Sequence, residues 1–238
     1  MNPPLLELKN LVKEYGGKPV VNGLSLFVNP GEIVGLLGPN GAGKTTAFYM
    51  TVGLIRPDSG DVFFQNQNIT HLPVHKRALM GLGYLAQEPS IFRSLSVEDN
   101  IRCILETQEK PEQTLSELLE ELHLTPLRHK KASALSGGER RRLEITRALV
   151  TQPALLLLDE PFANIDPLAI ADVKHLISLL KKKQISVLIT DHNAREIFSI
   201  VDRSYLVQQG KVLLSGTVDE LLSHSEARRS YFGEDFRL

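Results

Sequence analysis

The feature that most constrains this chain is a stretch that reads G-P-N-G-A-G-K-T, made of Gly38, Pro39, Asn40, Gly41, Ala42, Gly43, Lys44 and Thr45. It matches the pattern G-x-x-x-x-G-K-[ST] of a polyphosphate-binding loop. The glycines let backbone N–H groups point inward as an anion nest, and the start of the following helix adds positive potential. Lys44 is expected to reach the outer phosphates and the Thr45 hydroxyl to bind Mg²⁺, with Thr46 next in the nucleotide site.

The neighbouring sequence supports this interpretation. Residues 33–37 form a short apolar run, which predicts a buried strand, and residues 45–53 contain no proline and end on glycine, which predicts a short helix. The alternative is a plain glycine-rich turn. The order strand, loop and helix favours the phosphate-binding loop over that alternative.

Composition excludes several classes of function. The chain has 238 residues and a formal net charge of -1, so no strong field favours nucleic acid or an anionic membrane surface. Basic runs at residues 139–142 and 181–183 are interpreted as solvated helix faces. No apolar run approaches the ~20 residues that span a bilayer, so membrane contact is expected only through partners.

The single cysteine, Cys103, excludes an internal disulfide and a multi-cysteine metal site. Together with the lack of a signal peptide in the first residues, it predicts a reducing, cytoplasmic environment. Cys103 lies among Ile101, Ile104 and Leu105, so we expect it to be a small core residue.

Hydrophobic patterns divide the first part of the chain into strands followed by helices. Alternation predicts antiparallel strands over residues 5–15 and 18–28, and further strands over 61–65 and 82–86. From Glu88 the pattern becomes helical, with helices predicted over residues 97–107 and 113–124. Residues 88–148 are therefore interpreted as a helical insertion between strands.

The remaining residues return to strands that alternate with helices. Residues 154–158 include four consecutive leucines, which indicates a strand covered on both faces, as in a parallel sheet. A helix is predicted over residues 167–183, with Asp166 as its N-cap and Pro167 at its first position. A buried strand is predicted over residues 185–189, and a hairpin over 204–208 and 211–215.

Two acidic residues follow the leucine-rich strand. Asp159 is placed to hold the Mg²⁺ shell, and Glu160 to polarise a water for in-line attack on the γ-phosphate. Carboxylates at strand ends are sometimes only solvated turn residues. The phosphate-binding loop in the same chain favours the functional interpretation.

A second candidate anion site lies at Leu-Ser-Gly-Gly-Glu. Ser136 is expected to cap a helix, Gly137 and Gly138 to allow close approach, and Glu139 to begin an arginine-rich helix. One chain has only one complete phosphate-binding loop. The simplest account of two anion sites is a dimer, in which the Ser136 loop of one subunit covers the ATP that the other subunit holds.

With these motifs, residues 5–225 resemble the nucleotide-binding subunits of ABC transporters. The resemblance implies an Mg²⁺-dependent ATPase with a P-loop α/β fold, in which a RecA-like core carries an N-terminal antiparallel β-subdomain and an inserted α-helical subdomain. Residues 1–87 and 149–238 would form the core and β-subdomain, and residues 88–148 the helical subdomain. The family's signature is the Leu-Ser-Gly-Gly-Glu stretch before the leucine-rich strand.

The resemblance also assigns roles to single positions. It implies that Tyr15 stacks on adenine, that Gln87 contacts Mg²⁺ and water, that Asp166 crosses the dimer interface and that His192 contacts the γ-phosphate. For three of them an alternative remains when each is taken alone: a strand-end aromatic for Tyr15, a polar loop residue for Gln87 and a core histidine for His192. The order of all the motifs along the chain disfavours these alternatives together.

Longer stretches resemble the ATPases of lipopolysaccharide export within this family. They include residues 82–93, the Glu-Arg-Arg-Arg run after the signature, and the ending Y-F-G-E-D-F-R-L. Two places depart from the expected pattern, because Ala86 stands where proline is expected and Asn164-Ile165 where Gly-Val is expected. The alternatives are the ATPase of a branched-chain amino acid importer and a non-transport ABC protein.

This resemblance also implies partners and a location. The chain would form a head-to-tail homodimer with two composite ATP sites, beneath two membrane-spanning permease subunits and on the cytoplasmic face of the inner membrane. Those subunits are expected to dock near Phe92 and Arg93. Phe92 could instead be a core residue, and the sequence leaves that choice open.

Overall fold

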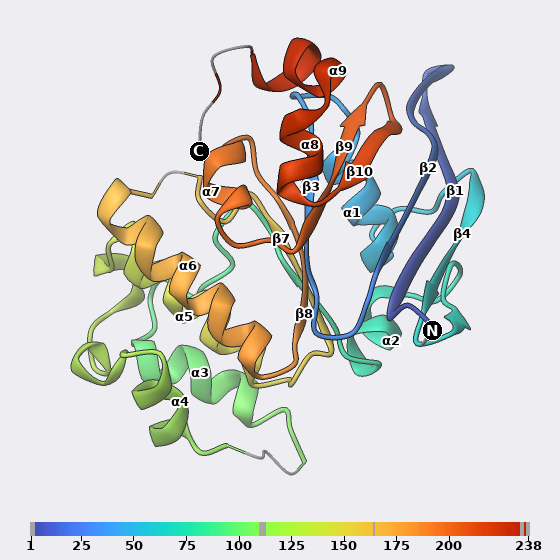
Figure 1. The fold of residues 1–238 in the computed structure, drawn as a ribbon. Coiled ribbons are helices and arrows are strands. Elements are labelled where there is room, and N and C mark those ends of the chain that lie inside the picture. Colours follow the sequence, from blue (N-terminus) through green and yellow to red (C-terminus); the bar gives the residue numbers. More distant parts are fainter. Residues whose placement is uncertain (1–2, 110–112, 164, 234–235, 237–238) are drawn as a thin grey trace.

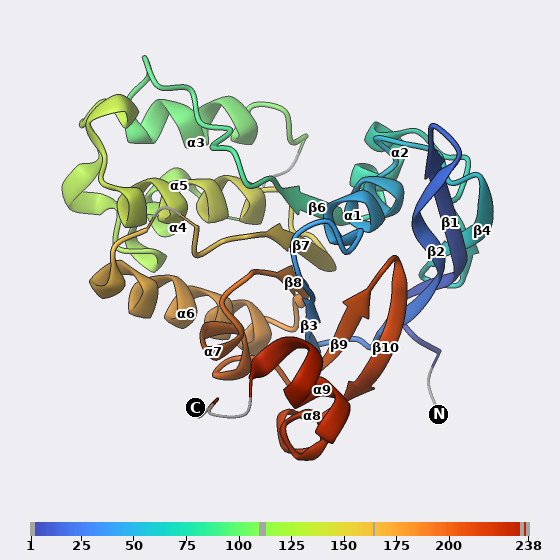
Figure 2. The same ribbon diagram turned by 90° about the horizontal axis from the view of Figure 1, so that it is seen from above.

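The computed structural model describes residues 3–109, 113–163, 165–233 and 236 (Figure 1). Several positions used above lie outside the described residues: the first two residues, Asn164, and residues 234, 235, 237 and 238 of the ending. The described part consists of two sheets and their helices, with the helix-rich region on the opposite side from the N-terminal strands (Figure 2).

The N-terminal sheet is antiparallel, as the alternating pattern predicts. Its order is β2-β1-β4-β5, made of Leu6–Tyr15 (β1), Lys18–Val28 (β2), Ser59–Phe64 (β4) and Gln67–Asn68 (β5). Inward-facing side chains such as Leu6, Leu8 and Leu24 are buried. They pack on Phe48 and Met50 of α1 (Lys44–Val52), so the helix that follows the phosphate-binding loop lies between the two sheets.

The second sheet has the order β10-β9-β3-β8-β7-β6 and is parallel except for β10. Its strands are Ile33–Leu37 (β3), Leu82–Leu85 (β6), Leu155–Asp159 (β7), Ser186–Thr190 (β8), Arg203–Gln208 (β9) and Lys211–Gly216 (β10). Every residue of β3, β7 and β8 is buried. Helices on both faces explain the unbroken apolar runs of these strands.

Helix α2 (Val74–Leu79) lies beside α1 on the side of the N-terminal strands, and most of the other helices lie on the far side of the sheet (Figure 2). The other helices are Val97–Leu105 (α3), Leu115–Glu121 (α4), Gly137–Leu149 (α5), Pro167–Lys182 (α6), Ala194–Phe198 (α7), Val218–Ser223 (α8) and Ser225–Ala227 (α9). Short 3₁₀ turns occupy Thr125–Leu127 and Ala132–Ala134, and a π turn occupies Arg228–Phe232. The described residues thus form the α/β architecture expected from the sequence.

The helix-rich region has a hydrophobic cluster of its own. Ile101 of α3, Leu118 of α4 and Leu143 of α5 meet there, whereas Ile145 and Leu149 of α5 belong to the cluster under the parallel sheet. Helix α5 therefore joins the two regions. The division of the chain at residues 88 and 148 stays a prediction.

Three sequence expectations are wrong in detail. Cys103 is exposed, because it lies about 200° around α3 from the buried Ile101. Arg141 is buried and paired with Glu144 at 2.8 Å, because α5 packs on α6 and against β6 and so has little free surface. The helix predicted over residues 113–124 is shorter, Leu115–Glu121, and His123 beyond it has a positive φ of 53°.

Other boundaries agree with the sequence. Asp166 caps α6 by accepting a hydrogen bond from the Ala169 N–H at 3.0 Å, and Pro167 is the first helical residue. The hairpin of β9 and β10 is present. Across the described ranges, none of the helices has both the length and the apolar character that crossing a bilayer demands.

Candidate functional site

The loops that follow the parallel strands meet at one edge of the sheet. β3 leads into the phosphate-binding loop, β6 leads to Gln87, β7 to Glu160 and β8 to His192. They surround a cavity of about 510 Å³ lined by Val20, Asn40, Gly41, Gly43, Lys44, Thr45, Thr46, Gln87, Glu160 and His192. Ligands of parallel α/β sheets bind beyond the carboxyl ends of the strands, and this cavity is at that place.

Glycine is required in the loop for both conformation and space. Gly43 has φ 98°, and a Cβ there would lie 2.5 Å from the Val20 carbonyl oxygen. Gly38 is equally confined, since its Cβ would lie 2.3 Å from the Val207 oxygen. A side chain at position 43 would push the loop away from β2, and one at position 38 would push it away from β9. Either change would alter the conformation of the phosphate-binding loop.

Lys44 is held inside this loop. Its Nζ donates to the carbonyl oxygens of Gly38 at 2.8 Å and Pro39 at 3.1 Å. Burial lowers the pKa of Lys44, and the nearby carboxylates of Glu160, Asp159 and Asp191 act in the opposite direction. An anionic phosphate would complete the environment of this ammonium group, which the loop otherwise satisfies only with neutral carbonyls.

Asp159 is a buried carboxylate beside the cavity. It is 1% exposed, and burial raises its pKa to about 6. Its Oδ2 accepts from the Tyr84 hydroxyl at 3.3 Å, and its Oδ1 is buried without a hydrogen-bond partner among the described residues. A buried, unpartnered carboxylate oxygen next to the Thr45 hydroxyl fits Mg²⁺, which takes oxygen ligands of both kinds.

Glu160 brings together the groups suited to activating a water. Gln87 donates from Nε2 to its Oε2 at 2.9 Å, and His192 Nδ1 lies 3.6 Å from the same oxygen. Glu160 has a positive φ of 47°, which is strained for a residue with a side chain and typical of functional sites. His192 is 60% exposed at its side chain, so it is not a core histidine.

Other predicted site residues lie outside this cavity. Tyr15 is 51% exposed at the end of β1, with the Lys13 ammonium 5.7 Å from its ring centroid. Asp166 caps α6, and Gly38, Pro39, Ala42 and Asp159 are also not among the residues that line the cavity. The residues Ser136, Gly137, Gly138 and Glu139 begin α5 and do not line the cavity.

The Ser136 loop is a helix entrance satisfied by its own chain. The Ser136 hydroxyl accepts from the Glu139 N–H at 3.2 Å, and the Glu139 carboxylate accepts from the Ser136 N–H at 2.7 Å. Gly138 allows α5 to approach α6, because a Cβ there would lie 2.5 Å from the Ala169 Cβ. The predicted cap is therefore confirmed, and Gly138 permits close packing of α5 on α6, while the role of Gly137 and Gly138 in an anion site stays a prediction.

Sequence reasoning missed two polar groups beside the cavity. Asp191 is fully buried, burial raises its pKa, and it accepts from the N–H groups of Phe162 at 3.1 Å and Asn193 at 2.9 Å. It follows β8 as Asp159 ends β7, so the same strand-end signal could have found it. Tyr84 lies within an apolar strand, and nothing in its sequence context distinguishes it from a core aromatic residue.

Phe92 lies in a loop that several buried groups hold in place. Its side chain is 47% exposed, with the Arg147 guanidinium 4.8 Å from its ring centroid. Its backbone is clamped by the fully buried Asn100, which accepts from the Phe92 N–H at 2.8 Å and donates to the Phe92 oxygen at 3.0 Å. The choice that the sequence left open is resolved in favour of an exposed ring.

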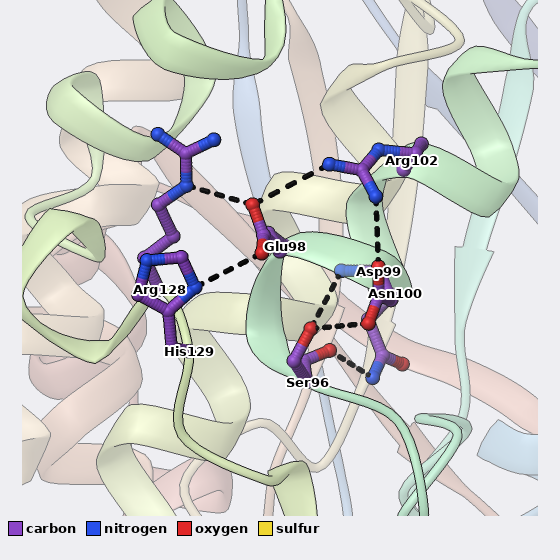
Figure 3. Close-up of polar contacts among 7 residues, drawn as sticks. All are labelled: Ser96, Glu98, Asp99, Asn100, Arg102, Arg128 and His129. Atoms are coloured by element: carbon purple, nitrogen blue, oxygen red, sulfur yellow. Dashed lines mark hydrogen bonds and ion pairs between the residues drawn. The ribbon is translucent and has the colours of Figure 1, made fainter.

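The start of α3 is fixed by a polar network close to this loop (Figure 3). Asn100 also donates to the Ser96 oxygen at 2.9 Å, and Ser96 caps the helix through Asp99. Glu98 accepts from Arg128 at 2.7 Å and contacts His129 at 3.0 Å, and the hydrogen bond from Arg128 is the main cause of its lowered pKa. The surface that carries Phe92 is thus built on a rigid support.

An apolar groove of about 570 Å³ lies on the face that carries α2. It is lined by Val52, Leu54, Val74, His75, Ala78, Leu79, Leu82, Gly83, Tyr84, Gln108 and Thr151. Leu54 is 53% exposed and Leu79 is 87% exposed. Thr151 lies four residues after Arg147, which covers the Phe92 ring, so the groove and Phe92 belong to neighbouring parts of the surface.

Comparisons with known proteins agree with this geometry. The sequence profile of a family described as "ABC transporter" matches residues 21–163. The chain is 51% identical over 242 residues to the "Lipopolysaccharide export system ATP-binding protein LptB" of Acidithiobacillus ferridurans, covering 98% of this chain and 99% of that protein. It is 50% identical over 238 residues to the protein of the same name from Escherichia coli (strain K12), with 98% and 99% covered.

Solved structures of ATP-binding cassettes share the fold. A nucleotide-free ATP-binding cassette from an ABC transporter superposes with a TM-score of 0.86 at 28% identity, covering 98% of this chain and all of that one. A second structure, of an ATP-binding cassette in its ADP conformation, gives the same TM-score of 0.86 at 28% identity, with the same coverage.

Proposed function

The chain belongs to the ABC transporter family, and from that premise we propose that it is the ATP-hydrolysing subunit of a lipopolysaccharide export system. The observation that carries the ATPase activity is the meeting of Lys44, Gln87, Glu160 and His192 around one cavity. The export function is supported by about 50% identity, along nearly the whole chain, to proteins named for lipopolysaccharide export.

ATP with Mg²⁺ is the cofactor that this family uses, and the cavity has the groups to hold both. The phosphate-binding loop and Lys44 neutralise the phosphates, while Thr45, Asp159 and the Gln87 amide oxygen supply oxygen ligands for Mg²⁺. The bound ion supplies charge stabilisation to the phosphates. Glu160 would accept the proton of the attacking water, and His192, whose Nδ1 lies 3.6 Å from the Glu160 carboxylate, would contact the γ-phosphate.

The chain acts as a homodimer. The Ser136 loop lies outside the cavity of its own subunit, yet it is a second helix entrance suited to an anion. In a head-to-tail pair, the Ser136 loop of one copy closes the cavity of the other, and Asp166 and Tyr15 lie at the edges of the composite site. Closure on ATP and opening after hydrolysis then shift the population between two states of the dimer.

Two membrane-spanning subunits dock on the face that carries the groove and Phe92. Exposed Leu54, Leu79 and Phe92 supply apolar area of the kind that partner interfaces bury. Arg93 is exposed beside Phe92 and contributes to the rim. The chain would thus reside at the cytoplasmic face of the inner membrane and contact it through these partners.

The test is affinity purification of the tagged full-length chain from detergent-solubilised inner membranes, with identification of bound proteins and lipid. Two membrane subunits together with lipopolysaccharide are expected. Recovery of amino acid permease subunits would contradict lipopolysaccharide as the substrate. Recovery of ribosomes or DNA in place of membrane subunits would contradict a transport function.

A matched pair of variants tests the docking surface in the same experiment. Phe92→Ala is expected to lose the membrane subunits, and Phe27→Ala to retain them. Phe27 is a suitable control because it is 42% exposed and also lies under an arginine, with Arg203 4.2 Å from its ring centroid. Equal recovery with both variants would show that Phe92 does not anchor the partner.

A further inference from the structure

Tyr84 is the residue that touches both the groove and the nucleotide site. It lies on the edge strand β6 and pairs with Leu157 of β7. Its ring lines the groove, while its hydroxyl lies 3.3 Å from Oδ2 of Asp159. One side chain therefore connects the apolar groove with the Asp159 carboxylate.

The contact matters because Asp159 has few other partners. The Thr45 hydroxyl lies next to the carboxylate and the Tyr84 hydroxyl donates to its Oδ2, so the Tyr84 contact is one of two side-chain restraints on Asp159. The Tyr84 hydroxyl is the donor in this contact, because a carboxylate can only accept. A donor on Oδ2 leaves Oδ1 directed to other ligands.

The opposite wall of the groove is rigid. Helix α2 carries Arg77, which is 1% exposed and donates to four backbone oxygens, those of Leu72, Met50, Thr51 and Thr70, at 2.7 to 2.9 Å. Met50 and Thr51 belong to α1, the helix that starts at Lys44. Because α2 is anchored in this way, we expect a partner bound in the groove to displace the Tyr84 side chain and not α2.

We propose that Tyr84 is a positioning residue, which orients Asp159 for Mg²⁺ through its hydroxyl and transmits occupation of the groove to that carboxylate through its ring. The second part rests on the proposed docking of a partner in the groove. The first part concerns the isolated chain alone. A partner that presses on the ring would move the hydroxyl, and with it the carboxylate, without touching the nucleotide.

The first experiment uses Tyr84→Phe, which removes one oxygen and leaves the ring in the groove. Binding of a fluorescent, non-hydrolysable ATP analogue to the full chain is measured in EDTA and during titration with Mg²⁺. Binding in EDTA is expected to stay within about twofold of the wild type. The Mg²⁺ concentration at half-saturation is expected to rise about tenfold, the lower end for loss of one hydrogen bond to a charged group.

Tyr205→Phe is the matched control. Tyr205 is 4% exposed, its hydroxyl accepts from the Phe27 N–H at 3.1 Å, and it lines neither the nucleotide cavity nor the groove. Its Mg²⁺ midpoint should equal that of the wild type. An unchanged midpoint in Tyr84→Phe, or an equal shift in Tyr205→Phe, would overturn the positioning role.

The second experiment fills the groove without a partner. Ala78 is exposed on α2 and lines the groove, so Ala78→Phe places a ring beside Tyr84, and Ala171→Phe on exposed α6 surface is its control. Ala78→Phe is expected to shift the Mg²⁺ midpoint at least about twofold in the wild type and not in the Tyr84→Phe background. Additive shifts would overturn the link to the groove.

These results are independent of the purification experiment. If no membrane subunits are recovered but the midpoints shift as expected, the proposed transport function fails and the role of Tyr84 stands. If the subunits are recovered and the midpoints stay equal, the proposed transport function stands and the role of Tyr84 fails.

Discussion

The phosphate-binding loop and the Ser136 loop are both helix entrances suited to anions, but their surroundings differ. The first is surrounded by side chains that follow three other strands, Gln87, Glu160 and His192, and it lies near the buried Asp159, which has an unpartnered oxygen. The second is exposed, and its Ser136 and Glu139 satisfy each other in a capping box. Buried charges near the first loop destabilise the fold, and a bound ligand would offset that destabilisation. The polar groups of Ser136 and Glu139 in the second loop are already paired with each other.

This difference indicates where the chemistry resides. A site with uncompensated groups is organised for a ligand, because such groups are otherwise destabilising. A loop whose groups are already paired offers mainly its backbone N–H groups to whatever approaches from outside. Four predictions test this contrast, in order of decreasing effect.

The largest effect is expected from Glu160→Gln. The amide cannot accept the proton of the water, so ATP turnover should fall at least about 100-fold while ATP binding is retained. A closed dimer should accumulate with ATP, as measured by light scattering. Glu196→Gln, in a surface ion pair with Lys174, is the control. Near-normal hydrolysis in Glu160→Gln would refute the role of Glu160.

The second prediction asks whether the two loops act in one chain or across two. Lys44→Ala damages the phosphate-binding loop, and Ser136→Asp keeps a good N-cap residue while placing a negative charge toward the phosphates. Each variant alone should be inactive. Mixed, they form heterodimers with one intact composite site, so about a quarter of wild-type turnover should return.

The control for mixing is Lys44→Ala with Glu160→Gln, both of which damage the side of the site formed by the phosphate-binding loop. No heterodimer of these two has an intact site, and no activity should return. If Lys44→Ala and Ser136→Asp also fail to complement each other, the Ser136 loop does not act across an interface.

The third prediction concerns the buried charge of Asp159. Its pKa of about 6 in the folded chain exceeds that of an unfolded aspartate, so stability falls as the pH rises between these values. Asp159→Asn should raise the free energy of unfolding of the nucleotide-free chain at pH 8 by about 1–3 kcal/mol. The difference should vanish near pH 4, as followed by thermal or denaturant unfolding.

Asp172→Asn on the exposed surface of α6 serves as control, since it removes a solvated carboxylate. A wild type as stable as Asp159→Asn at pH 8 would contradict an uncompensated charge at this position. So would a difference that grows on acidification.

The smallest effect is expected at the Ser136 loop, and it has the opposite sign. Burial alone would raise the pKa of Glu139, but the Ser136 N–H and Lys130 outweigh it and the pKa is lowered. Stability from this carboxylate is therefore present at neutral pH and lost as the pH falls through the lowered pKa. Glu139→Gln should destabilise the chain by about 0.5 kcal/mol at pH 7 and not at pH 3. A stabilising effect at pH 7 would contradict the paired state.

Local sequence was sufficient for the phosphate-binding loop, the strand-end acids and the caps. These features depend on neighbours within a few residues, such as Gly43 before α1 or Asp166 before Pro167. The buried strands were also predictable, because β3, β7 and β8 are apolar on both faces and show it as unbroken runs.

Features that depend on packing between distant segments were not predictable. Arg141 reads as part of a solvated run, yet α5 lies where it buries that side chain with Glu144. Cys103 reads as apolar core, yet the direction of α3 exposes it. Tyr84 reads as an ordinary strand aromatic, and only the parallel pairing of β6 with β7 brings its hydroxyl to Asp159.

The sequence by itself determined which chemical groups this protein has for binding a nucleotide, because the phosphate-binding loop, the helix start and each strand end are short contiguous segments. Tertiary structure alone decided which of them meet: Gln87, Glu160 and His192 converge, and the Ser136 loop stays apart. The physical reason is that parallel strands bring their carboxyl ends to one edge whatever their separation in the chain. No local sequence pattern predicts which edge of the sheet the start of a helix, such as the Ser136 loop, will face.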